Sequence, residues 1–160
     1  ILRANPDPSP ELAGRCFLRD VQVVVAAPSL PRPSRQRDVP VPVITLPRAP
    51  AEASWKLHRA RSELSVATRS VLCLSSMAMI HDAVLAGVGA AAMPRSLVQA
   101  DIDAGRLIDW GMLSGRRIEV WALYPSHRHL SARVSAFVTL LVDRFENASP
   151  RAFAQFANRG

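Results

Sequence analysis

Hydrophobic residues over 74–94 change their spacing in a way that predicts a helix between two strands. Apolar residues recur three or four positions apart over 76–86, which indicates a helix. Ser75 and Ser76 are suited to begin this helix because serine is a favoured N-cap residue. Gly87 is suited to end it because glycine adopts the left-handed conformation without strain.

Apolar runs on both sides of this helix predict strands. The run at 71–74 is short enough for a buried strand, and the run at 89–93 contains only small or apolar residues. The N-terminus of the helix therefore follows the carboxyl end of a strand. Open α/β sheets bind ligands at such points, and unpaired amides there favour anions.

The rest of the pattern alternates strands with helices, which predicts the α/β class with a mainly parallel sheet. Residues 47–65 are polar and are expected to be irregular, with Trp55 and Leu57 pointing inward. Loops are expected at 28–42 and 111–115. Further strands are predicted at 21–27, 43–46, 69–74, 107–110 and 118–124, and helices at 96–104 and 130–146.

Composition limits the classes of function. The chain has 160 residues, which suits one domain by size, and no apolar run approaches the ~18 residues of a membrane span. Of its 20 basic residues 19 are arginine, and they give a net charge of +7. These arginines are scattered and are not interleaved with aromatic residues, so the charge does not by itself predict a nucleic-acid-binding surface.

The sequence does not predict an enzyme, a cofactor or a metal site. His81 and Asp82 are neighbours on a predicted helix, so their side chains point about 100° apart and cannot form a relay with each other. His58 and His81 are read as isolated. Cys16 and Cys73 are far apart and are expected to be reduced, packed thiols, as is usual in the cytoplasm.

Three motifs in this order resemble the effector-binding domain of LysR-type transcriptional regulators. They are S-S-M-x-x-I-x-x-A-V-L-A-G-V-G-A-A-A-M-P at 75–94, G-R-L-I at 105–108 and A-L-Y-P-S-H-R-H-L-S-A-R-V-S-A-F-V at 122–138. L-R-A-N-P-D-P-S-P-E-L at 2–12 is a weaker match, and 30–68 matches poorly. The resemblance implies a periplasmic-binding-protein-like fold of the second type, with two Rossmann-like subdomains joined by two crossing strands.

The resemblance also implies a division of the chain. Residues 28–118 would form the second subdomain, and residues 1–27 with 119–160 would form a partial first subdomain with the hinge strands. The helix-turn-helix, its linker helix and the first strand–helix–strand portion of the effector domain are absent relative to the family, so the chain is expected to be a fragment. Apolar side chains on the last helix, namely Val134, Phe137 and Leu141, are then expected to be exposed and covered by another chain.

In the family the effector lies in the cleft between the subdomains. The hydroxyls and amides at the start of the helix at 76–86 would hold a polar group of the ligand, where the family often has Asn-Asp or a similar polar pair. Each position also has a simple structural alternative: serine caps helices, methionine fills cores and arginine occupies surfaces. The predicted ligand-binding residues are Ser75, Ser76, Met77, Arg3, Asn5, Met93 and Pro94.

The function expected from the resemblance is effector sensing in a cytoplasmic LysR-type transcription factor. A small ligand such as a carboxylate would modulate DNA binding by the absent helix-turn-helix, in a dimer or a tetramer. The partners expected are therefore an effector, a second copy of the protein and, through the absent domain only, DNA; no membrane is expected. A periplasmic solute-binding protein of a transporter shares the architecture and is the main alternative, and a basic nucleic-acid-binding module is a second.

Overall fold

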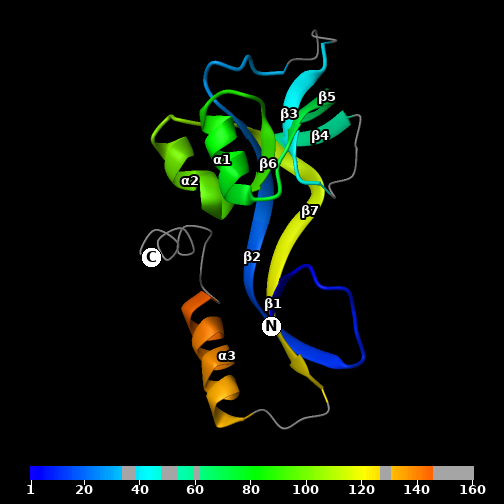
Figure 1. Cartoon of the computed structure of the whole chain (residues 1–160), viewed down its shortest axis with the longest axis vertical. Coiled ribbons are helices and arrows are strands. Elements are labelled where there is room, and N and C mark those ends of the chain that lie inside the picture. The colour runs from blue at the N-terminus through cyan, green and yellow to red at the C-terminus, as the bar shows by residue number, and fades with distance from the viewer. Residues whose placement is uncertain (34–38, 48–53, 60–61, 127–130, 146–160) are drawn as a thin grey trace. The chain divides into compact units, whose positions relative to one another are not determined.

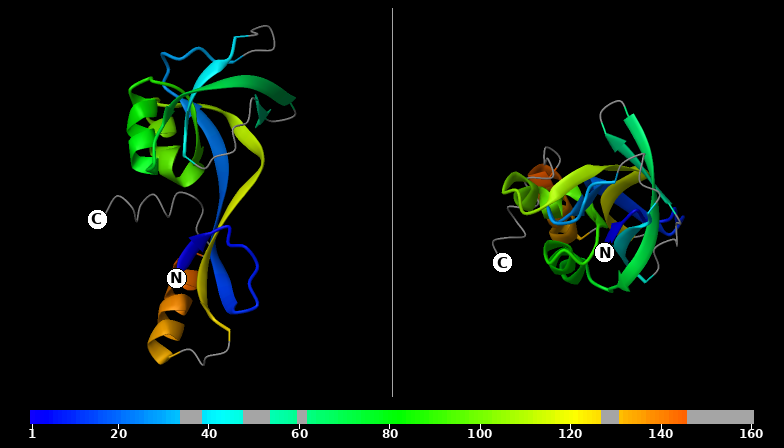
Figure 2. Two further views of the ribbon diagram at one scale, coloured as in Figure 1. Left: turned by 45° about the vertical axis from the view of Figure 1, so that its right-hand side comes forward. Right: turned by 90° about the horizontal axis from the view of Figure 1, so that it is seen from above.

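The computed structural model describes residues 1–33, 39–47, 54–59, 62–126 and 131–145, without the side chains of 115 and 116. The chain divides into two compact units, Ile1–Val21 with Arg117–Gly160 and Gln22–Arg116. Two long neighbouring strands, β2 (Leu12–Ala26) and β7 (Ile108–Pro125), contribute residues to both units (Figures 1 and 2). The assignment of 28–118 and of 1–27 with 119–160 to functional subdomains stays a prediction.

The second unit contains a curled sheet that almost closes on itself. Its further strands are β3 (Val41–Thr45), β4 (Ser54–Arg59), β5 (Ser62–Cys73) and β6 (Ala91–Pro94), in the order β3-β5-β4-β7-β2-β6. A parallel bridge between Val43 and Ala90 joins β3, the first strand of this order, to the residue that immediately precedes β6, the last. At the bridge Ile44 N donates to Ala90 O over 2.8 Å, and Ala90 N donates to Pro42 O over 2.9 Å.

The inside of this curl holds a hydrophobic core. Trp55 and Leu57 are 8% and 2% exposed, which confirms that they point inward. The core also includes Val24, Ala26, Val43, Val66, Ala90, Trp110 and Leu113.

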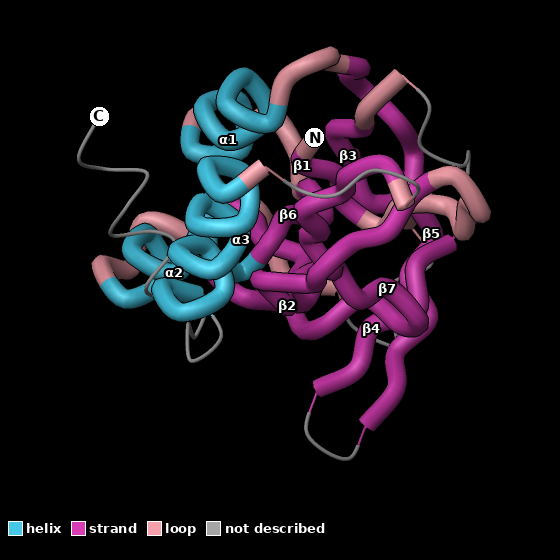
Figure 3. Tube along the Cα trace, turned by 90° about the horizontal axis from the view of Figure 1, so that it is seen from below, coloured by secondary structure: helices cyan, strands magenta, loops and turns pink. Residues whose placement is uncertain are grey.

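Two helices cover the other side of β6. They are α1 (Met77–Leu85), which contacts β3 and β6, and α2 (Arg95–Asp103), which contacts β6 (Figure 3). Ile80, Val84 and Val98 are their most buried apolar side chains. The positions of α1 and α2 confirm the helices predicted at 76–86 and 96–104.

Several predictions for this unit are wrong. The sheet is not mainly parallel: β3 pairs parallel with β5, but β4–β5, β4–β7 and β2–β6 are antiparallel. The stretch predicted to be irregular, 47–65, contains β4 and the start of β5. The predicted loop at 111–115 lies within β7. Gly111 continues the strand with a φ of 134°, and its lack of a Cβ lets the His58 carbonyl approach closely, since a Cβ there would lie 2.7 Å from His58 O. The strand end at 71–74 is exposed or half-buried, and Cys73 is exposed.

In the first unit a helix packs on one face of two strands. α3 (Ala132–Phe145) confirms the helix predicted at 130–146 and packs with Phe17, Leu18 and Ala122 through Val138, Val142 and Phe145. The short strand β1 (Leu2–Ala4) pairs antiparallel with β7. Val134 and Phe137 are 42% and 52% exposed, as expected, whereas Leu141 is half-buried against the core and its neighbour Leu140 is exposed. Coverage of this face by another chain stays a prediction.

Candidate functional site

The predicted ligand-binding position is the start of α1. β5 ends at Cys73, and Ser76 follows as the N-cap residue with φ −126° and ψ 135°. Its carbonyl accepts the first helical hydrogen bond, from Ile80 N over 3.0 Å. The Ser76 hydroxyl makes no capping hydrogen bond, although capping was the structural alternative for this residue. The hydroxyl is therefore available to another partner, together with the amides of the first helical turn.

The side chains around this position differ in exposure. Ser75 is exposed, whereas Ser76 and Met77 are half-buried. Helix α1 carries no acidic residue in its first turn, so no carboxylate competes there with an anionic ligand. Two uncharged hydroxyls and a set of amides at a positive helix end can donate several hydrogen bonds to one small anion.

Two other predicted residues belong to β6 in the same unit. Met93 is fully buried and lies opposite Val23 in the antiparallel pair with β2, so its side chain fills the core. Pro94 is half-buried, lies opposite Gln22 and is the N-cap residue of α2. The structure gives Met93 a packing role, and contact of either residue with a ligand stays a prediction.

Arg3 and Asn5 belong to the first unit. Arg3 is exposed on β1, opposite Trp121. Asn5 has a left-handed φ of 45°, and its side chain ties this turn to β7: Nδ2 donates to Arg117 O over 3.0 Å, and Glu119 N donates to Oδ1 over 2.7 Å. Asn5 therefore has a structural role, which the sequence analysis did not predict.

A charged cluster joins α1 to α2. His81 Nε2 lies 2.7 Å from Asp101 Oδ2, and Arg106 Nε lies 2.6 Å from Asp101 Oδ1. Burial alone would raise the pKa of Asp101, but the hydrogen bonds from His81 and Arg106 outweigh burial and hold that pKa below its usual range. The reading of His81 as isolated was wrong. The sequence did contain a signal for this contact. Asp101 is a charged residue at an inward position of a predicted helix, and a buried charge needs a partner.

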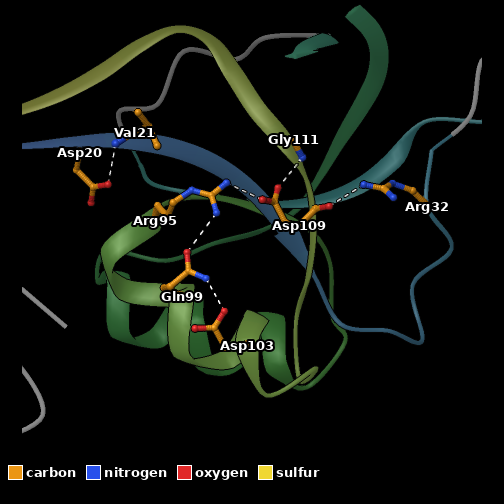
Figure 4. A network of polar contacts seen from close by, with 8 residues as sticks. All are labelled: Asp20, Val21, Arg32, Arg95, Gln99, Asp103, Asp109 and Gly111. Atoms are coloured by element: carbon orange, nitrogen blue, oxygen red, sulfur yellow. Dashed lines mark hydrogen bonds and ion pairs between the residues drawn. The ribbon is translucent and has the colours of Figure 1, made fainter. Parts of the chain in front are cut away.

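A second polar network fixes the start of α2 (Figure 4). Asp109 Oδ2 accepts from Arg95 Nη2 over 2.6 Å, and its Oδ1 accepts from Gly111 N over 2.8 Å. Arg32 Nη2 donates to the backbone oxygen of Asp109 over 2.6 Å, although burial lowers the pKa of Arg32 and the charge of Arg59 lowers it further. Asp109 thus holds α2 and the loop after β2 against β7.

Other chemistry has little support among the described residues. No group of three His, Cys, Asp or Glu side chains in this part of the chain is placed to hold a metal ion. Both cysteines are free, and burial raises the pKa of the half-buried Cys16 thiol, as does the charge of Glu119, which disfavours the reactive thiolate. No described helix is long and apolar enough to cross a membrane.

Comparisons with known proteins agree with the resemblance. A family model described as "LysR substrate binding domain" matches residues 1–146. The regulator PtxR of Pseudomonas aeruginosa, an "HTH-type transcriptional regulator", is 35% identical over 91 residues, which are 55% of this chain and 28% of PtxR. The "probable HTH-type transcriptional regulator LtrA" of Klebsiella pneumoniae is 25% identical over 153 residues, or 88% of this chain and 48% of LtrA. The chain therefore spans half or less of these curated relatives.

The solved structures show the same fold. The regulatory domain of CrgA, a LysR-type transcriptional regulator from Neisseria meningitidis, superposes with a TM-score of 0.73 at 20% identity, covering 90% of this chain and 74% of that domain. The full-length virulence activator AphB of Vibrio cholerae gives a TM-score of 0.71 at 18% identity, covering 90% and 51%. These likenesses confirm the predicted periplasmic-binding-protein-like α/β fold class.

Proposed function

We propose that this chain, which belongs to the LysR substrate binding domain family, senses a small-molecule effector for a cytoplasmic transcription factor. Both curated relatives are described as helix-turn-helix transcriptional regulators. This favours a regulator over the periplasmic solute-binding protein that sequence alone left open. Effector binding would modulate DNA binding by a helix-turn-helix elsewhere in the regulator, which would act as a dimer or a larger homo-oligomer.

The observation that carries the proposal is the unused hydrogen-bonding capacity at the start of α1. The Ser76 hydroxyl makes no capping bond, and the first amide to bond within the helix is that of Ile80. A carboxylate at this position would accept from the hydroxyls of Ser75 and Ser76 and from the amide of Met77. A hydrogen bond to a charged group contributes roughly 1.5–3 kcal/mol, and the helix end adds about 0.3–1 kcal/mol.

The first experiment searches for the ligand by thermal shift, with a panel of small aliphatic and aromatic carboxylates. Binding to the folded state alone raises the unfolding temperature, by an amount that grows with the logarithm of the ratio of ligand concentration to dissociation constant. A carboxylate that stabilises the chain is then titrated calorimetrically. We expect its amide or alcohol analogue to bind at least about tenfold more weakly, since the charge-assisted bonds are lost.

Variants then locate the site. Ser76→Asp places a like charge beside the carboxylate and is expected to weaken binding most, whereas Ser76→Ala leaves the backbone amides and weakens it less. Ser131→Asp is the matched control, because Ser131 accepts a capping bond from Val134 N at the start of α3. Equal affinity in the parent chain and both Ser76 variants would place the ligand elsewhere.

The regulatory step needs the complete regulator. A mobility-shift titration of its operator DNA, with and without the carboxylate, measures the coupling between the two binding events. We expect a change of about fivefold or more in DNA affinity, as is typical of allosteric proteins. The same change should disappear when the regulator carries Ser76→Asp.

A further inference from the structure

The first unit contains a separate hollow of about 560 Å³. This volume lies within the range of small-molecule sites. The hollow lies under the loop that joins β1 to β2, and every residue that lines it belongs to the first unit. In Figures 1 and 2 this loop and α3 lie on opposite sides of the β2–β7 pair.

Alternation along β7 explains how the hollow forms. Val120, Ala122 and Tyr124 pack with the core beneath α3, so Trp121 and Leu123 point to the opposite face and line the hollow. Gly14 of β2 adds no side chain to this face. A Cβ at Gly14 would lie 2.6 Å from Leu123 Cδ2 and 3.5 Å from Trp121 Cε3. The glycine therefore leaves room for the leucine side chain beside the half-buried indole ring.

The loop over the hollow is fixed at both ends. Asn5 forms hydrogen bonds with the backbone of Arg117 and of Glu119. At the other end the Ser126 hydroxyl donates to Pro10 O over 2.9 Å, and Ser126 N donates to Glu11 O over 2.9 Å. The walls are thus positioned before any ligand arrives, which reduces the entropy lost on binding.

The charge of the lining is opposite to that of the chain. Asp7 and Glu119 line the hollow, and no lysine or arginine does, although the net charge of the chain is +7. Glu119 Oε1 accepts from Arg19 Nε over 3.1 Å, but the arginine side chain is 77% exposed. An ion pair this exposed is weak and screened, so Arg19 competes poorly with a cation held inside the hollow.

We propose that this hollow binds an organic cation with an apolar body, such as an arylalkylammonium ion. The ammonium group lies between the carboxylates of Asp7 and Glu119. The apolar body lies against Leu123 and the face of Trp121, where the ring also attracts the positive charge. The inference does not depend on the proposed effector site, since that site lies in the other unit and favours an anion.

The test uses three probes of one shape and different charge: phenethylammonium, 2-phenylethanol and phenylacetate. Each is titrated into the isotope-labelled 160-residue chain, and the indole N–H resonances of its three tryptophans are followed by NMR. We expect phenethylammonium to shift the Trp121 resonance saturably and to bind about fivefold or more tightly than the neutral alcohol. Phenylacetate should leave that resonance in place.

Charge variants separate a local site from general attraction. Glu119→Gln and Asp7→Asn should each weaken phenethylammonium binding, by up to about fivefold. Glu11→Gln is the matched control, because it removes the same charge from the same loop outside the hollow. Equal binding of the ammonium and the alcohol, equal weakening by Glu11→Gln, or no saturable shift of Trp121 would each overturn the proposal.

Discussion

His81 Nε2 lies 2.7 Å from Oδ2 of Asp101, and this contact joins two helices whose contact residues are 20 positions apart. The same carboxylate accepts from Arg106 Nε over 2.6 Å, and the Asp101 carbonyl accepts from the amides of Arg106 and Leu107. Asp101 therefore holds α1, α2 and the turn after α2 together. It is 7% exposed, so its charge depends on these partners.

Removing the charge of Asp101 should destabilise the protein. We expect Asp101→Asn to lower the free energy of unfolding by about 1–3 kcal/mol, because both partners lose a charge-assisted hydrogen bond. Urea unfolding followed by circular dichroism measures this. Asp82→Asn is the control: Asp82 lies 3.8 Å from His81 Nδ1, but its side chain is 83% exposed, so the change should be within about 0.5 kcal/mol. Equal losses in the two variants would contradict the role given to Asp101.

Asp101 should also make stability depend on pH. Its pKa is below the usual 3.8 in the folded chain, so the unfolded chain binds a proton first as the pH falls. The stabilisation is therefore complete above pH ~5, where the unfolded carboxyl is ionised, and is lost as the pH falls through the folded pKa. The difference in unfolding free energy between the parent chain and Asp101→Asn should shrink from pH about 7 to pH about 2. A difference that stays constant over this range would contradict the prediction.

Gly87 and Gly105 form a matched pair of helix ends. Their φ angles are 78° and 71°, and an alanine in this region costs about 1–2 kcal/mol. A Cβ at Gly87 would lie 3.0 Å from Ser29 Oγ, whereas a Cβ at Gly105 would meet no atom within 4 Å. We expect both alanine variants to lower the unfolding temperature and Gly87→Ala to lower it more. The opposite order would mean that the Ser29 contact is of no consequence.

The exposed side of α3 should promote association. Phe137 is 52% and Leu140 61% exposed, and such apolar surface is a common contact between proteins. We expect the chain to self-associate at high concentration, and Phe137→Glu to reduce the mass measured by light scattering with little change in unfolding free energy. Thr139→Glu, also exposed on α3, controls for the added charge. An unchanged mass in Phe137→Glu would contradict this prediction.

Local signals in the sequence predicted the elements with clear ends. Ser76 and Gly87 mark the two ends of α1, because an N-cap residue and a left-handed glycine have specific backbone conformations. Trp55 and Leu57 were correctly predicted to point inward even though β4 itself was not recognised. Only one face of β4 packs on the core, so buried and exposed side chains alternate along it. This alternation can be recognised in the sequence although the other residues of the strand are polar.

Features that depend on distant partners were missed. Strand direction in the sheet is set by the path of the chain between strands, which hydrophobic spacing does not encode. The glycine at 111 looked like a loop residue, but it allows β7 to pass close to the carbonyl of His58. The partner of His81 lies on another helix, and the structural role of Asn5 requires β7, whose contacting residues lie more than 110 positions away.

The bridge between Val43 and Ala90 gives the curled sheet a seam in place of two open edges. Its hydrogen bonds are those of Ile44 N and Ala90 N, so hydrogen exchange at these two amides should report the opening of the seam. An opened seam would uncover unpaired backbone on β3 and β6, next to the valine-rich run of β2. Exposed strand edges of this kind recruit other chains. Protection of these edges therefore depends on a bridge far shorter than the strands that it closes.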